Sequence, residues 1–120
     1  MASVLIVDDD PDIRFLERMA LKIADQGFTV VGEASSGEEA LTLWRELRPD
    51  VIVLDDRLPS LRGLDVARLI LAEQPAQVIV LLTPYEDDAV TATALSLGVR
   101  VCLPKTDLGR LLTQLLPHPL

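Results

Sequence analysis

Five polar residues follow short apolar segments whose composition is typical of buried strands. These segments are rich in valine, isoleucine and leucine and show no alternation, as in strands buried on both faces of a parallel sheet. In open α/β sheets, the side chains at the carboxyl ends of the strands meet in one crevice, where ligands bind. The residues at or just beyond these ends are Asp8, Asp9, Asp55, Thr83 and Lys105.

The types of these residues predict phosphoryl chemistry. Three carboxylates in one crevice repel one another and require a cation, and oxygen ligands with room for water suit Mg²⁺. A hydroxyl and an ammonium group beside the ion, from Thr83 and Lys105, can hold the remaining oxygens of a phosphoryl group. Asp55 can then act as the nucleophile and form an acyl phosphate. A single aspartate at a strand end is more often a helix cap, so the hypothesis depends on all the residues together.

The elements that position these residues alternate strictly between strand and helix. The segment that follows Asp10 and Pro11 begins as a helix should, with a capping carboxylate and then proline, and we expect Ile13, Leu16, Ala20 and Ile23 to form its inward stripe. The predicted strands are 4–7, 28–33, 51–54, 78–82 and 100–103. The predicted helices are 11–25, one opened by 36–39 that stops before Pro49, 64–73, one that begins at the acidic segment 86–88 and runs to Leu97, and a short last helix from Thr106 or Asp107 to Leu116. Partial alternation in 28–33 indicates a strand at the sheet edge. Five βα units in this order predict one α/β domain, a parallel sheet with helices on both faces.

Composition excludes several classes of function. The formal charge of −8 and the pI of about 4.4 disfavour direct binding to nucleic acid. Cys102 is the single cysteine of the chain, so no internal disulfide forms, as is typical of a reducing cytosol. No apolar segment is long enough for a membrane span, and the first residues lack the basic segment of a signal peptide. We therefore expect a cytoplasmic protein that does not bind membranes.

The chain resembles the receiver domains of response regulators in bacterial two-component signalling, which are CheY-like. The resemblance covers essentially the whole chain, and it implies the flavodoxin-like (βα)5 fold, with strand order 2-1-3-4-5. It also implies a single receiver domain over 1–120, with a core of about 3–116 and no output domain. The matching motifs are Val4 to Pro11, Pro49 to Asp55 with Pro59 and Gly63 beyond it, Leu82-Thr83, and Gly98 leading to Lys105.

The resemblance also implies a role for each residue of the site. Asp55 is then the phosphoacceptor, and Asp9, Asp55 and the backbone carbonyl of Arg57 hold Mg²⁺, with Asp8 binding it mainly through water. Thr83 moves toward the phosphoryl group and Lys105 pairs with it. The implied phosphodonor is a histidine kinase or a phosphotransfer protein, and the domain catalyses only transfer to, and hydrolysis from, its own aspartate. Output would pass by contact with a downstream protein that the sequence does not name, and the face made by helix four, strand five and helix five is a candidate homodimer or partner surface.

Three departures from the family pattern have predicted consequences. Pro84 follows Thr83 and has no N–H to donate to a phosphoryl oxygen, so we expect one contact fewer. Cys102 stands where many receivers have an aromatic residue that turns inward on activation. The proline beside Lys105 precedes it, whereas the family often has one after it. Arg57 and Tyr85, two residues beyond Asp55 and Thr83, are expected to flank the mouth of the site.

Two other functional hypotheses compete with that of a phosphorylated switch. One is a receiver-fold interaction module whose phosphorylation is weakened or lost, which Pro84 and Cys102 favour. The other is an unrelated α/β phosphatase with an aspartyl nucleophile. Such enzymes usually have a second aspartate two residues after the first, where this chain has Arg57, so the sequence disfavours that reading.

Overall fold

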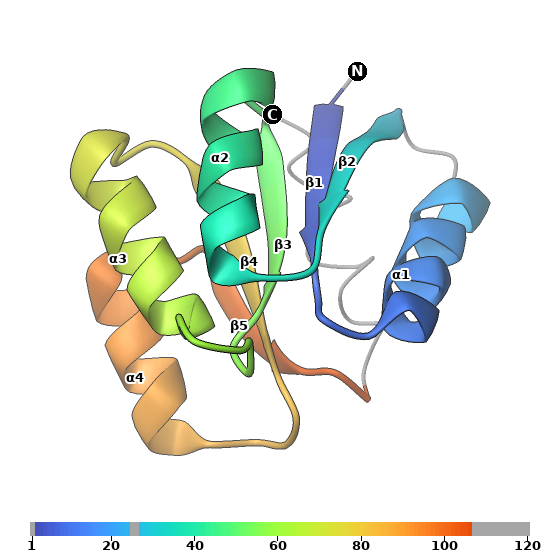
Figure 1. Ribbon diagram of the computed structural model, residues 1–120. Coiled ribbons are helices and arrows are strands. Elements are labelled where there is room, and N and C mark those ends of the chain that lie inside the picture. The colour runs from blue at the N-terminus through green and yellow to red at the C-terminus, as the bar shows by residue number, and fades with distance from the viewer. Residues whose placement is uncertain (1, 25–26, 107–120) are drawn as a thin grey trace.

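The computed structural model describes residues 2–24 and 27–106. Its elements follow the predicted alternation of strands and helices, because each short apolar segment is followed by an amphipathic one (Figure 1). The elements are β1 (Ala2–Val7), α1 (Pro11–Ala24), β2 (Phe28–Ala34), α2 (Gly37–Leu47), β3 (Val51–Asp55), α3 (Gly63–Glu73), β4 (Val78–Thr83), α4 (Asp88–Leu97) and β5 (Val101–Pro104). The predicted last helix lies outside the described residues.

The sheet has five parallel strands in the order β2-β1-β3-β4-β5, which confirms the predicted fold class and strand order. Strand β2 lies at an edge, as its alternating pattern predicted. The central strand β3 is buried along its whole length, because it has neighbours on both sides and helices over both faces. Its last residue is Asp55, so the strand runs one residue further than predicted and includes the carboxylate.

Two apolar clusters, one on each face of the sheet, hold the layers together. On one face, alternate strand residues pack against α2, α3 and α4, with the buried Trp44 as the largest side chain. On the other face, the remaining strand residues pack with Leu21 of α1. Figure 1 shows the same division, with α1 on one side of the sheet and the other three described helices on the opposite side. Among the described residues, no helix is long and apolar enough to cross a bilayer.

Local signals explain where the helices begin and end. Asp10 Oδ1 accepts a hydrogen bond from the backbone N–H of Asp12 at the start of α1. Ser36 accepts from the N–H of Glu39, and Asp87 accepts from two N–H groups in the first turn of α4. Gly98 ends α4 with φ at 105°, a left-handed conformation that favours glycine.

The orientation of α1 differs from the prediction. Leu16 was expected to face inward, but its side chain is 49% exposed. The inward positions are instead Glu17 and Leu21, which are 0% and 2% exposed. Helical spacing allows both faces, since apolar residues occur on each, and contact with the sheet selects the face that carries the glutamate.

Candidate functional site

The acidic site lies where β1 and β3 end side by side. Val7 pairs with Leu54 across these neighbouring strands, so Asp8 and Asp55 follow at the same level of the sheet. Both carboxylates are buried, and one ammonium group pairs with both of them. Lys105 Nζ lies 2.8 Å from Asp8 Oδ2 and 3.0 Å from Asp55 Oδ2.

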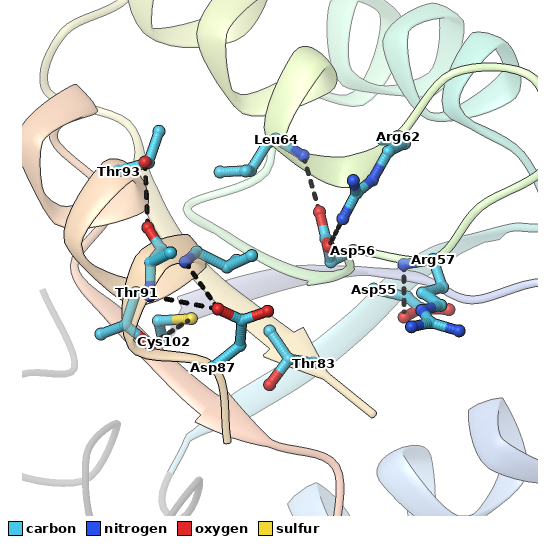
Figure 2. A network of polar contacts seen from close by, with 12 residues as sticks. Asp55, Asp56, Arg57, Arg62, Leu64, Thr83, Asp87, Thr91, Thr93 and Cys102 are labelled. Carbon is cyan, nitrogen blue, oxygen red and sulfur yellow. Dashed lines mark hydrogen bonds and ion pairs between the residues drawn. The ribbon is translucent and has the colours of Figure 1, made fainter. Parts of the chain in front are cut away.

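The donor set fits a hard divalent cation. One carboxylate oxygen from each of Asp8, Asp9 and Asp55 lies within 4.8 Å of the others, and Asp9 is exposed to solvent. Three carboxylate oxygens with an open side for water match the preference of Mg²⁺ for oxygen ligands and retained waters. The predicted fourth protein ligand is the carbonyl of Arg57. The backbone N–H of this residue donates to Asp55 Oδ1 at 3.0 Å, which holds the start of the loop against the carboxylate (Figure 2).

Burial and neighbouring charges change the acidity of the site. The pKa of Asp55 is raised to about 6, mainly by burial; the hydrogen bond from Lys105 acts to lower it, and the charge of Asp8 acts to raise it. Burial also acts to lower the pKa of Lys105, but its hydrogen bonds to Asp8 and Asp55 outweigh this and raise it above the usual value. Lys105 is therefore a firmly charged partner, and a cation in the pocket would favour the ionised, nucleophilic form of Asp55.

Thr83 lies at the end of β4 but its hydroxyl does not reach Asp55. The hydroxyl oxygen lies 2.6 Å from the carbonyl of Tyr85, to which it donates. The backbone carbonyl of Thr83 accepts a hydrogen bond of 2.6 Å from the N–H of Lys105, which joins the ends of β4 and β5. The structure thus brings Asp8, Asp55 and Lys105 into contact, whereas Thr83 would have to leave Tyr85 to join them.

Arg57 and Tyr85 meet across the mouth of the site. Arg57 Nη2 donates to the phenol oxygen of Tyr85 at 3.2 Å, and the guanidinium carbon lies 5.6 Å from the centre of the ring. The pair connects the loop after β3 to the loop after β4. That both residues flank the entry to a phosphoryl group on Asp55 stays a prediction.

Asp56 is a residue of the site that sequence reasoning missed. Its side chain is buried, pairs with Arg62 and accepts a hydrogen bond of 3.2 Å from the N–H of Leu64 in the first turn of α3 (Figure 2). Its N–H donates to Leu82 on β4. Asp56 therefore ties the loop after β3 to α3 and β4. The available signal was a helix start at Gly63 without a capping side chain next to it.

Cys102 is half-buried on β5, and the hydroxyl of Thr91 lies 3.5 Å from its sulfur. Burial raises the pKa of the thiol above its usual value. A thiol of raised pKa is a poor nucleophile near neutral pH, so this cysteine behaves as a small side chain of the α4–β5 region.

A parallel five-stranded sheet with an acidic pocket and a lysine at its carboxyl edge is the arrangement of a receiver domain. The family model for the response regulator receiver domain matches residues 4–116, and the chain belongs to this family. It is thus a receiver domain of two-component signalling, as its motifs predicted.

Sequence relatives support this assignment. The chain is 43% identical over 105 residues to a protein-glutamate methylesterase/protein-glutamine glutaminase of Hahella chejuensis, covering 86% of this chain and 30% of that protein. It is 38% identical over 99 residues to the response regulator GacA of Pseudomonas aeruginosa, covering 82% of this chain and 45% of that protein. The chain therefore spans less than half the length of these curated relatives.

Solved structures agree with the fold. A two-component response regulator of the LuxR family from an Aurantimonas species superposes with a TM-score of 0.86 at 32% identity, over 94% of this chain and 81% of that one. The response regulator domain of Thermotoga maritima CheB gives a TM-score of 0.84 at 27% identity, over 98% and 92% of the two chains.

Proposed function

We propose that this domain is a phosphorylation-controlled switch that accepts a phosphoryl group on Asp55 in a Mg²⁺-dependent reaction. The observation that carries the proposal is the convergence of Asp8, Asp9 and Asp55 on one pocket, with Lys105 bound to two of them. The phosphodonor would be a histidine kinase or a phosphotransfer protein, and the setting would be the cytoplasm. We propose that 1–120 functions as one receiver domain and signals by protein contact, without binding nucleic acid itself.

The residues of the pocket have separate tasks in this reaction. Asp55 attacks phosphorus through a carboxylate oxygen, the new P–O bond forms, and the donor leaves with the electron pair of the broken bond. Lys105 pairs with a phosphoryl oxygen in place of the ion pair that it makes with the carboxylate of Asp55 before phosphorylation. Asp8, Asp9, Asp55 and the carbonyl of Arg57 would hold Mg²⁺, which neutralises charge on the transferring group. Thr83 would turn from Tyr85 to a phosphoryl oxygen, and hydrolysis by water would reset the domain.

Intact-mass spectrometry with acetyl phosphate tests this proposal. The wild-type chain should gain one phosphoryl group when Mg²⁺ is present and none when it is chelated. The matched control is Asp55→Asn, which keeps the shape of the side chain but removes the nucleophile and should gain nothing. A folded wild-type chain that shows no adduct at early time points would refute the switch and favour the interaction module without phosphorylation.

The second candidate function is that interaction module, and Pro84 is the observation that favours it. Replacing Pro84 with alanine restores an N–H beside Thr83, which can donate to the phosphoryl group. We expect this hydrogen bond to contribute about 1–3 kcal/mol and to lengthen the acyl-phosphate lifetime about fivefold or more. The decay of the adduct, followed by intact mass, measures this. Pro75→Ala, remote from the site, is the control, and an unchanged lifetime in Pro84→Ala would show that the proline only shapes the loop.

Arg57 provides a second positive charge, besides Lys105, at the proposed mouth of the pocket. We expect Arg57→Ala to slow phosphorylation by acetyl phosphate about 3–10-fold at low ionic strength, since the donor is anionic. At high salt the initial rates of the wild type and Arg57→Ala should converge, because salt screens exposed charges. Arg57→Lys keeps the charge and should retain most of the rate. Equal rates for wild type and Arg57→Ala at low salt would exclude steering by this residue.

A further inference from the structure

Glu17 is a buried carboxyl group that the phosphoryl chemistry does not use. It lies on α1, one turn after Ile13 and one turn before Leu21, on the stripe that packs against the sheet. Its side chain is fully buried. Neither carboxyl oxygen has a hydrogen-bond partner among residues 2–24 and 27–106.

In the described part of the chain, the cations of the neighbouring elements pair with carboxylates other than Glu17. Arg14 Nε lies 3.1 Å from Glu33 Oε1, and Arg18 on the next turn pairs with the other oxygen of Glu33. Lys105 is bound to Asp8 and Asp55. Among the described residues, Glu17 is thus left without a paired counter-charge, so its neutral form is favoured.

The charged groups that act on Glu17 lie on or just beyond four strands of the sheet. The pKa of Glu17 is raised to about 8, mainly by burial; the charges of Asp8, Asp55 and Glu33 also raise it, and the charge of Lys105 lowers it. These groups lie at the ends of β1, β3 and β5 and on β2. The acidic pocket and Lys105 therefore influence the protonation of Glu17 through space, and no ion pair or hydrogen bond joins them to it within the described part of the chain.

We propose that Glu17 is a proton-binding site coupled to the acidic pocket, which releases its proton when a divalent cation binds there. The cation would offset the negative charge of Asp8, Asp9 and Asp55. It would also weaken the ion pairs that Asp8 and Asp55 make with Lys105. Both changes favour ionised Glu17. The carboxylic acid becomes a carboxylate, and the proton passes to solvent. Because linkage is reciprocal, raising the pH would tighten cation binding. This inference rests on the proposed function, since it requires the pocket to bind Mg²⁺.

Proton release on titration with MgCl₂, followed with a pH-stat at pH 8, tests the coupling. Near its midpoint Glu17 is about half protonated, so the wild-type chain should release up to about half a proton per bound Mg²⁺. Asp55, with a pKa of about 6, is almost fully ionised at this pH and adds almost nothing. Glu17→Gln is neutral and of the same shape, so it should bind Mg²⁺ and release almost none. Glu46→Gln, an exposed position on α2, should match the wild type.

The outcomes separate this inference from the proposed function. Equal proton release by wild type and Glu17→Gln, with Mg²⁺ bound in both, would overturn the coupling and leave the phosphoryl switch intact. Absence of Mg²⁺ binding in the wild type would overturn both. Glu17→Leu is the second variant; leucine suits the apolar stripe, and this variant should also bind Mg²⁺ without proton release. Circular dichroism confirms that each variant is folded.

Discussion

Replacing Glu17 with leucine is expected to raise the free energy of unfolding at pH 8 by about 2–4 kcal/mol. A carboxyl group buried without a partner destabilises the folded state, and leucine buries apolar surface at the same place. The neighbouring Leu21 already packs in the cluster that the new side chain would join. Most substitutions of buried residues destabilise a protein, so an increase of this size would be diagnostic.

The pH dependence gives this prediction a definite sign. The pKa of Glu17 is about 8 in the folded chain against an ordinary 4.5, so the folded state binds the proton more tightly than the unfolded state does. The contribution of this proton binding to the free energy of unfolding of the wild type is therefore fully present below about pH 4.5. It is lost as the pH rises toward about 8. Asp55 has the same trend up to about pH 6, but it is present in both proteins and cancels in the difference.

Urea unfolding followed by circular dichroism at pH 5, 6.5 and 8 measures the effect. The advantage of Glu17→Leu over wild type should grow with pH across this series. Glu46→Leu is the control at an exposed position and should change stability by no more than about 0.5 kcal/mol. If the difference in free energy of unfolding between Glu17→Leu and wild type were the same at all three pH values, the surroundings of Glu17 would not raise its pKa.

Replacing Gly63 with alanine is expected to destabilise the domain by about 2–3 kcal/mol and to slow phosphoryl uptake. A Cβ at this position would lie 2.3 Å from the carbonyl oxygen of Asp55 and 2.7 Å from the Cα of Asp56. Both are backbone atoms, so the added methyl group must displace the end of β3 or the start of α3. That movement would shift the phosphoacceptor itself.

Gly32→Ala on β2 is the matched control for this experiment. Its Cβ would lie 2.7 Å from Leu47 Cδ1, the end of a flexible and partly exposed side chain that can move away. We expect a smaller loss of stability and unchanged phosphoryl uptake. Urea unfolding and initial rates with acetyl phosphate and Mg²⁺ provide the two readouts. Equal effects of the two substitutions on uptake would show that the close approach of Gly63 to Asp55 does not position the acceptor.

The amino-acid sequence by itself determined the order of elements and the edge of the sheet at which the site lies. Segments such as Val51–Leu54 are too apolar for exposed structure and too short for helices, so they must be central strands. Parallel strands all present their carboxyl ends at one edge, and this alone brought Asp8, Asp55 and Lys105 to the same place. Local chemistry also fixed helix starts at Asp10 and Ser36, because capping depends on near neighbours in the chain.

Only the tertiary structure decided which groups touch and which face of α1 is buried. The pattern of α1 permits either Leu16 or Glu17 to face the sheet, and the choice depends on packing against strands that are distant in sequence. Thr83 could point to the pocket or away from it, and the carbonyl of Tyr85 holds its hydroxyl in this structure. The raised pKa of Glu17 follows from burial and from charges on or just beyond four strands. These groups are distant in sequence, so no local pattern predicts their combined effect.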